Sequence, residues 1–216
     1  MRVQAFIPDW DNPTTDAELL YRQLSEFCPT QILKRRNVAS AYQWQEMLEK
    51  FDADVALWMM ADVRLPNMKE MFPEMMRLLS RPDIAIYAPF IDWQISMDAS
   101  RPQTYGAIEP EVYEVKINDG AMFAVTSKLL SLLPPFIPED NPQCCYYTTF
   151  MAMYARRNGL KVVRDYRFRA KHPYGSSWNC CEGLRQSQVW VANLPSQDND
   201  EMMRIFDVAR MMKESI

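Results

Sequence analysis

The sequence predicts an α/β protein with one sheet that is mostly parallel and becomes mixed in its second half. Three strand-then-helix repeats in the first part of the 216-residue chain predict the parallel half, because each helix returns the chain to start another parallel strand. Two later segments predict the mixed half. "VYEVKI" (112–117) alternates in period two, and "AMFAV" (121–125) follows across Asn118-Asp119-Gly120, which is typical of a tight turn.

The parallel half is expected to contain four strands and three helices. The expected strands are the segments 2–8, 30–36, 55–60 and 83–89. The continuous apolarity of "VALWMM" (55–60) suits a strand that is covered on both faces. Apolar residues recur at helical spacing in the three segments between the strands. These stripes are Ala17, Leu20, Leu24 and Phe27, then Ala41, Trp44, Leu48 and Phe51, then Met68, Met71, Phe72, Met75, Met76 and Leu79.

The second half is expected to continue with helices and one short strand. A helix starts near Thr126 and ends before Pro134, and another carries an aromatic stripe and ends at Gly159. "KVVRD" (161–165) is expected to be a strand. Asp198, with a glutamate three residues later, resembles a capping box and predicts the start of the final helix.

Composition narrows the class of protein. A hydrophobic content of 48% suffices for a sizeable core, and a net charge of -4 argues against a general polyanion-binding surface. The longest apolar runs are far shorter than the roughly 20 residues of a membrane helix. Two adjacent cysteine pairs without CxxC spacing, and no signal-like segment, indicate reduced thiols. We therefore expect a soluble, cytoplasmic protein with no membrane partner.

Two residues stand out as candidates for chemistry. Asp62 follows the apolar segment 55–60, so it either forms the turn before the next helix or projects into the crevice where open α/β folds bind ligands. His172, the only histidine, stands in the loop-like segment 169–179 instead of on an apolar face. An imidazole and a carboxylate can share a divalent cation with phosphate oxygens.

A basic segment interrupts the otherwise acidic chain between residues 156 and 172. Its cations are Arg156, Arg157, Lys161, Arg164, Arg167, Arg169 and Lys171. They are either solvated charge at the ends of helices and strands or contacts to the phosphates of a nucleotide or nucleic acid. Aromatic residues in and after this segment, including Trp178, suit stacking on a sugar or base and equally suit packing onto the domain.

Several motifs in order resemble the glycosyltransferase family-two-like proteins of the GT-A fold. They are "AFIP", "MADVRLP", "NDGAMFAVTSKLL", "ARRNGLKV" and "RDYRFRAKHPYG", which together cover residues 2–179, and the last resembles phage-encoded members in particular. The resemblance implies one GT-A-like domain over 1–216, with a nucleotide-binding half (1–100), an acceptor and metal half (101–180) and a C-terminal helical extension (181–216). It also implies transfer of a sugar from a nucleotide-diphosphate sugar to an acceptor hydroxyl, assisted by Mn²⁺ or Mg²⁺.

The resemblance also implies site residues. Asp62 matches the final acid of the DxD-type metal motif, and His172 matches the late histidine that completes the metal site. The nucleotide-sugar contacts that it implies, besides Asp62, are Pro8, Asn37, Gly120 and, as a stacking partner, Trp10. Candidate contacts to the acceptor or to phosphate are Arg164, Arg167, Arg169, Lys171 and Trp178.

Two positions depart from the family pattern. Met60 replaces the first acid of the metal motif, and Thr148 stands where inverting members carry the general base. Either another acid acts as the base, or the enzyme retains configuration, or the chain no longer catalyses transfer. We favour another acid, with Asp119 ahead of Asp140 and its neighbour Glu139.

The acceptor is not specified by the motifs. The phage-type resemblance suggests a hydroxymethylated base in phage DNA, which would place the protein in the host cytoplasm, and the alternatives are a glycan or a small molecule. A non-catalytic module that binds nucleotide sugars is the rival from another functional class, because Met60 and Thr148 replace two acids.

Overall fold

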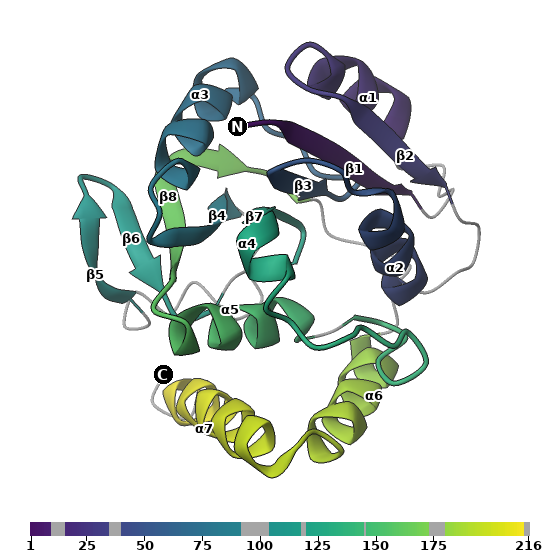
Figure 1. Ribbon diagram of the computed structural model, residues 1–216, viewed down its shortest axis with the longest axis vertical. Coiled ribbons are helices and arrows are strands. Elements are labelled where there is room, and N and C mark those ends of the chain that lie inside the picture. Colours follow the sequence, from purple (N-terminus) through teal and green to yellow (C-terminus); the bar gives the residue numbers. More distant parts are fainter. Residues whose placement is uncertain are drawn as a thin grey trace.

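The described part of the protein contains one mixed sheet of eight strands. Figure 1 shows how the helices and strands are arranged in the computed structural model. The structure describes residues 1–9, 16–34, 40–91, 104–117, 120–144, 146–172 and 180–213. Four residues with predicted roles lie outside these ranges: Trp10, Asn37, Asp119 and Trp178.

The strands are arranged in the order β2-β1-β3-β7-β4-β8-β6-β5. Their bounds are β1 (Val3–Asp9), β2 (Thr30–Lys34), β3 (Val55–Met59), β4 (Ile84–Ile91), β5 (Thr104–Glu109), β6 (Val112–Val115), β7 (Met122–Thr126) and β8 (Lys161–Ala170). Strands β2, β1 and β3 are parallel, and so are β4 and β8. Between these two groups lies β7, which is antiparallel to both of its neighbours, and the sheet is therefore mixed as predicted.

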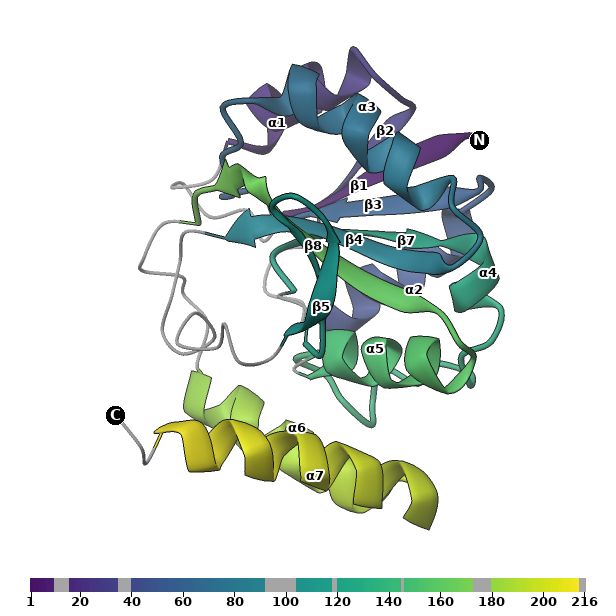
Figure 2. The ribbon, with the colours of Figure 1, turned by 90° about the vertical axis from the view of Figure 1, so that its left-hand side faces the viewer.

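Helices cover both faces of the sheet (Figures 1 and 2). Helices α1 (Ala17–Ser25) and α3 (Met68–Leu79) lie on one face. The other face carries α2 (Ser40–Lys50), α4 (Ser127–Leu130) and α5 (Tyr147–Arg157). Beyond α5 lie α6 (Cys180–Ala192) and α7 (Ser196–Lys213), which form a further layer on that side.

The apolar pattern of β3 explains why the sheet is buried on both faces. Alternate residues point to opposite faces of a strand. Leu57 and Met59 join the core under α1 and α3, whereas Ala56 and Trp58 join the core under α2 and α5. A fully buried large apolar side chain contributes about 1.5–3 kcal/mol. The prediction that this strand is covered on both sides is confirmed.

The turn predicted at residues 118–120 does not join two neighbouring strands. Strand β6 pairs with β5 and β8, whereas β7 pairs with β3 and β4, so the two segments that flank the turn are not adjacent in the sheet. The actual hairpin joins β5 to β6, with Glu111 in the left-handed conformation at φ 61°. Strand β5 has no clear signal in the sequence, because its residues do not alternate between polar and apolar side chains.

Other predicted boundaries change in the second half. Strand β8 continues to Ala170, well beyond the predicted end at residue 165, and the helix expected from Thr126 is the single turn α4. Helix α7 starts at Ser196, so Asp198 lies inside its first turn. The buried Asp198 carboxylate accepts hydrogen bonds from the Tyr154 hydroxyl at 2.9 Å and from Arg157, and it therefore joins α7 to α5.

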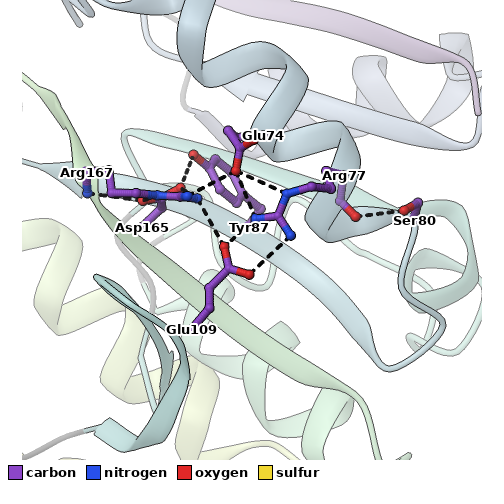
Figure 3. Close-up of polar contacts among 7 residues, drawn as sticks. All are labelled: Glu74, Arg77, Ser80, Tyr87, Glu109, Asp165 and Arg167. Carbon is purple, nitrogen blue, oxygen red and sulfur yellow. Dashed lines mark hydrogen bonds and ion pairs between the residues drawn. The ribbon is translucent and has the colours of Figure 1, made fainter.

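A network of ion pairs anchors β8 to its surroundings (Figure 3). The Asp165 carboxylate is fully buried and accepts hydrogen bonds from Arg167 Nε at 2.9 Å and from the Tyr87 hydroxyl at 3.3 Å. Burial and the neighbouring carboxylate raise the pKa of Tyr87 well above its ordinary value. The Arg167 guanidinium also lies 3.0 Å from Glu74 of α3. Strands β4 and β8 are thereby joined to α3.

Arg77 extends the network to the edge of the sheet. Its guanidinium donates to Glu74 on its own helix and to Glu109 at the end of β5. Glu109 also lies 3.4 Å from Arg167. The network therefore holds the β5–β6 hairpin against α3, as Figure 3 shows.

The buried carboxylate makes the network testable. We expect Arg167→Met to lower the free energy of unfolding, because it leaves the buried Asp165 without its cation. Breaking a fully buried pair costs about 3–5 kcal/mol, and we expect about 2 kcal/mol here because the Arg167 side chain is 31% exposed. Urea denaturation measures the change.

Arg185→Met is the matched control, because Arg185 pairs with the exposed Glu182 on the surface of α6. Exposed pairs contribute little to stability, so the urea midpoint of this variant should not change. Equal shifts for the two variants would contradict the special role of the buried carboxylate.

Candidate functional site

The chain turns directly after β3, and this turn is held between two other strands. The Met60 N–H donates to the Ala121 carbonyl at 2.9 Å, and the Ala61 N–H donates to the Pro8 carbonyl at 3.3 Å. Asp62 is the next residue. The turn thus carries Asp62 to the carboxyl edge of β1 and β3, where open α/β sheets bind ligands.

Two reciprocal backbone hydrogen bonds join the segment after Asp62 to the segment before His172. The Arg64 N–H donates to the Lys171 carbonyl at 2.8 Å, and the Lys171 N–H donates to the Arg64 carbonyl at 2.7 Å. As a result, His172 Nε2 lies 3.2 Å from Asp62 Oδ1. His172 is 9% exposed and the Asp62 side chain is 19% exposed, so the pair is largely shielded from solvent.

Arg64 also supports Asp62 through its side chain. Its Nη1 donates to the carbonyls of Ala61 at 2.9 Å and Val63 at 3.0 Å, the two residues that flank Asp62. This role of Arg64 was not predicted from the sequence. The available signal was a cation two residues after the acid in "MADVRLP", although a basic residue at that spacing is common in exposed turns.

Gly120 lies beside the first turn of α5. A Cβ atom built on Gly120 would lie 3.7 Å from Thr148 Cγ2, which is an ordinary van der Waals contact. Thr148, where the resemblance implies a general base, therefore lies beside Gly120, two residues before β7. Asp119, the favoured alternative base, directly precedes Gly120 in the chain and lies outside the described residues.

The Asp62–His172 pair fits a cation shared with a ligand. A carboxylate oxygen and an imidazole nitrogen both bind Mn²⁺, and Mg²⁺ commonly uses one or two carboxylates together with substrate phosphates. Among the described residues, no group of three or more His, Cys, Asp or Glu side chains is placed to hold a metal ion. A cation at this pair would therefore need further ligands from a bound diphosphate and water.

Asp140, the second candidate base, lies elsewhere. It is exposed, and it lines a pocket of about 520 Å³ between the loop 134–140, α5, α6 and the start of α7. Neither Asp62 nor His172 lines this pocket. Its neighbour Glu139 accepts a hydrogen bond from the Tyr42 hydroxyl at 3.4 Å. The structure therefore does not bring Asp140 to the Asp62–His172 pair.

Several cations of the basic segment have partners within the fold. Arg164 is 8% exposed and donates to the Ile117 carbonyl at 3.0 Å. Arg167 belongs to the network around Asp165. The Arg169 guanidinium lies 4.9 Å from the centre of the Phe90 ring, and Lys171 is exposed. Strand β8 extends through this segment, so it buries Arg164 and leaves Arg167 and Arg169 at the surface.

Solved structures share this fold, although no protein-family model and no curated protein matches the sequence. The mannosyltransferase PcManGT from Pyrobaculum calidifontis, in complex with GDP-Man and Mn²⁺, has a TM-score of 0.61 at 12% identity, over 94% of this chain and 64% of that chain. Glucosyl-3-phosphoglycerate synthase from Mycobacterium tuberculosis, with Mn²⁺, UDP-Glc and phosphoglyceric acid, has a TM-score of 0.58 at 13% identity, over 88% and 77%.

A third neighbour is TarS from S. aureus in complex with UDP-GlcNAc, with a TM-score of 0.53 at 11% identity, over 93% of this chain and 70% of that chain. This chain thus spans less than two thirds of the length of PcManGT and more than two thirds of the length of the other two proteins. Identities this low establish the fold alone. The chain has the GT-A-like fold that the sequence resemblance implied.

The described residues contain no helix with the length and apolar character of a membrane span.

The side chain of Arg64 provides a test of the site geometry. We expect Arg64→Gln to weaken Mn²⁺ binding in the presence of UDP or GDP by about ten-fold, the lower end of the usual effect of losing a residue that supports a ligand. The fold should persist, because the bonds to Lys171 use only the backbone of residue 64. Electron paramagnetic resonance of free Mn²⁺ measures the affinity.

Arg156→Gln is the control, because the Arg156 side chain also donates to a backbone carbonyl. Its acceptor is the carbonyl of Lys116, the residue directly after β6, at 2.8 Å. The Mn²⁺ affinity of this variant should equal that of the unmodified protein. A similar loss of affinity in both variants would mean that the effect of Arg64 is not local.

Proposed function

We propose that this chain is a glycosyltransferase that moves a sugar from a nucleotide-diphosphate sugar to an acceptor hydroxyl with a divalent cation. The observation that carries the proposal is the 3.2 Å contact between Asp62 and His172. The hydrogen bonds between Arg64 and Lys171 bring these distant segments together at the carboxyl edge of the sheet. Neighbours with the same fold were crystallised with Mn²⁺ and GDP-Man or UDP-Glc, which supports the proposal.

The roles follow from position. Asp62 and His172 would hold Mn²⁺ or Mg²⁺, which when bound offsets the negative charge that develops on a departing diphosphate. Pro8, at the end of β1, would contact the nucleoside together with Trp10 and Asn37. Within the single domain, residues 1–100 would serve nucleotide binding, 101–180 the acceptor and metal, and 181–216 would be a helical extension.

The general base is proposed to be Asp119. The hydroxyl of Thr148 is too weakly basic to accept a proton from an acceptor at neutral pH, although Thr148 lies beside Gly120. Asp119 adjoins Gly120 in the chain, and Gly120 is the proposed contact to the donor sugar. A carboxylate there would take the proton of the attacking hydroxyl during an inverting transfer.

Turnover tests the proposal. The protein is incubated with a panel of nucleotide sugars and Mn²⁺, and release of nucleoside diphosphate is measured with and without acceptors. We expect release with at least one donor, and we expect Asp62→Asn to reduce it by about a hundred-fold or more, because losing residues that merely support a metal ligand already costs about ten- to a hundred-fold.

Asp140→Asn is the matched control for this experiment. Asp140 is also an acid, but it is exposed in a different pocket, so its removal should leave release unchanged. Equal losses in the two variants would contradict the assignment of Asp62. Absence of both nucleotide binding and release across the panel would overturn the proposed function.

The second candidate is a module that binds nucleotide sugars without turnover. Met60 and Thr148 favour it, because each replaces an acid that the family pattern places at the site. Both candidates predict that nucleotide and Mn²⁺ stabilise the protein, so thermal shift does not separate them. Binding without release for every donor and acceptor would support the module.

Among acceptors, a hydroxymethylated base in phage DNA is our narrower proposal, ahead of a glycan or a small molecule. Such a base would have to leave the duplex stack to reach the site. Lys171, which is exposed and directly precedes His172, would contact the phosphates together with the exposed Arg169. This version places the protein in the host cytoplasm.

The salt dependence of DNA binding tests the narrower proposal. Binding to a duplex should weaken as the salt concentration rises. Lys171→Glu should lower the steepness of the plot of log binding constant against log salt concentration by about one or more, because each phosphate contact contributes about that much. Lys128→Glu, at an exposed position on α4, is the control. No binding at low salt would exclude the DNA acceptor and leave the transferase proposal intact.

A further inference from the structure

A pocket that the proposed transfer does not use lies between α5, the loop 134–140, α6 and the start of α7. Figure 2 shows α6 and α7 as a layer outside α5. The pocket has a volume of about 520 Å³, which is within the roughly 300–1,000 Å³ typical of sites for small ligands. All the residues that line it belong to the described ranges, and neither Asp62 nor His172 is among them.

Three partly exposed aromatic rings from three elements form walls of the pocket. They are Phe136 of the loop, Tyr154 of α5 and Trp190 of α6. Phe136 packs on Tyr147 with ring centres 4.7 Å apart, and Tyr154 and Trp190 pack on Phe150 with ring centres 4.8 and 5.2 Å apart. Because Tyr147 and Phe150 are buried, they hold the three rings in place without a ligand. The walls are therefore preformed, which lowers the cost of binding.

The rim of the pocket exposes aliphatic side chains. Ile137 and Val189 line the pocket and are each 50% exposed. Exposed apolar side chains that gather beside a pocket are typical of a binding site. We therefore expect the ligand to have an apolar body.

The charge at the pocket is negative. Glu139 and Asp140 line it and are both exposed. Glu139 accepts a hydrogen bond from the neutral Tyr42 hydroxyl, and in the part of the chain that the structure describes neither carboxylate forms an ion pair. A third acid at the pocket, Asp198, is already paired with Arg157. The two exposed carboxylates therefore remain available to a cationic ligand.

We propose that this pocket binds a small organic cation, which carries an ammonium group on an aromatic or aliphatic body. Glu139 and Asp140 would attract the charge, and a cation within about 6 Å of an aromatic ring centre is attracted to the face of the ring. Arg157 already lies 5.4 Å from the centre of the Tyr154 ring, so Trp190 is the ring left for the ligand that attracts cations best.

A neutral sugar is the competing ligand. It would stack on the same rings but would make no use of the negative charge. The inference does not depend on the proposed function, because the pocket contacts neither member of the Asp62–His172 pair.

The test uses three probes with the same phenyl body: phenethylammonium, phenethyl alcohol and phenylacetate. Each is titrated at low salt into the full, isotope-labelled chain, and the NMR signal of the Trp190 indole N–H is followed. The Trp190→Phe variant identifies this signal, because it removes the indole and keeps an aromatic ring. We expect phenethylammonium to bind about ten-fold more tightly than the alcohol, and phenylacetate to bind most weakly.

Glu139→Gln combined with Asp140→Asn should remove this preference, so that phenethylammonium and phenethyl alcohol bind equally. The matched control combines Glu18→Gln with Glu70→Gln, which removes the same charge. These two acids are exposed on α1 and α3, on the opposite face of the sheet. The control variant should therefore bind each probe as the unmodified protein does.

Equal affinities of the unmodified protein for the ammonium and the alcohol, or a Trp190 signal that does not move, would overturn the proposal. Equal losses in the two double variants would also overturn it, because they would indicate a general effect of charge. A shift caused by methyl glucoside and not by phenethylammonium would assign the pocket to a neutral sugar instead. If Trp190→Phe does not fold, Trp190→Tyr identifies the signal in its place.

Discussion

The antiparallel direction of β7 is the constraint on which the candidate site depends. Because β7 runs against β3 and β4, its amino end lies at the edge where those strands end. The Met60–Ala121 hydrogen bond joins the end of β3 to the start of β7, and it places Gly120 at the edge that also holds Asp62. A parallel strand in the same position would have put residue 120 at the opposite edge. The mixed sheet is therefore what allows the chain after residue 117 to contribute to a site begun by the first three strands.

The strands and helices with a regular apolar pattern were predicted from the sequence. A strand that forms only because it pairs with a neighbouring strand was not. Strands β1, β3 and β4 and helices α1 to α3 carry clear apolar patterns, because each buries a whole face. Strand β5 lacks alternation and exists as a strand because it pairs with β6 at the edge of the sheet. Turn residues such as those at 118–120 report local bending and do not identify the partner of each flanking strand.

The same distinction applies to the site. Asp62 and His172 were predicted by residue type and motif order. Arg64 was not, because its side chain acts by donating to backbone carbonyls that the folded turn brings near it. The partners of the basic segment also depend on the fold. A strand alternates its side chains between two faces, so a run of arginines along β8 is divided between buried partners and solvent.

The bond between residues 64 and 171 also has a consequence for synthesis. Its two partners are separated by most of the sheet, including β4, β6 and β7. During translation, the segment with Asp62 emerges early, and the segment with His172 emerges only after these strands. A chain that is still being made therefore lacks the Asp62–His172 pair, and it gains no stabilisation from a ligand that needs both residues. Ligand-dependent stability would thus distinguish finished molecules from incomplete ones.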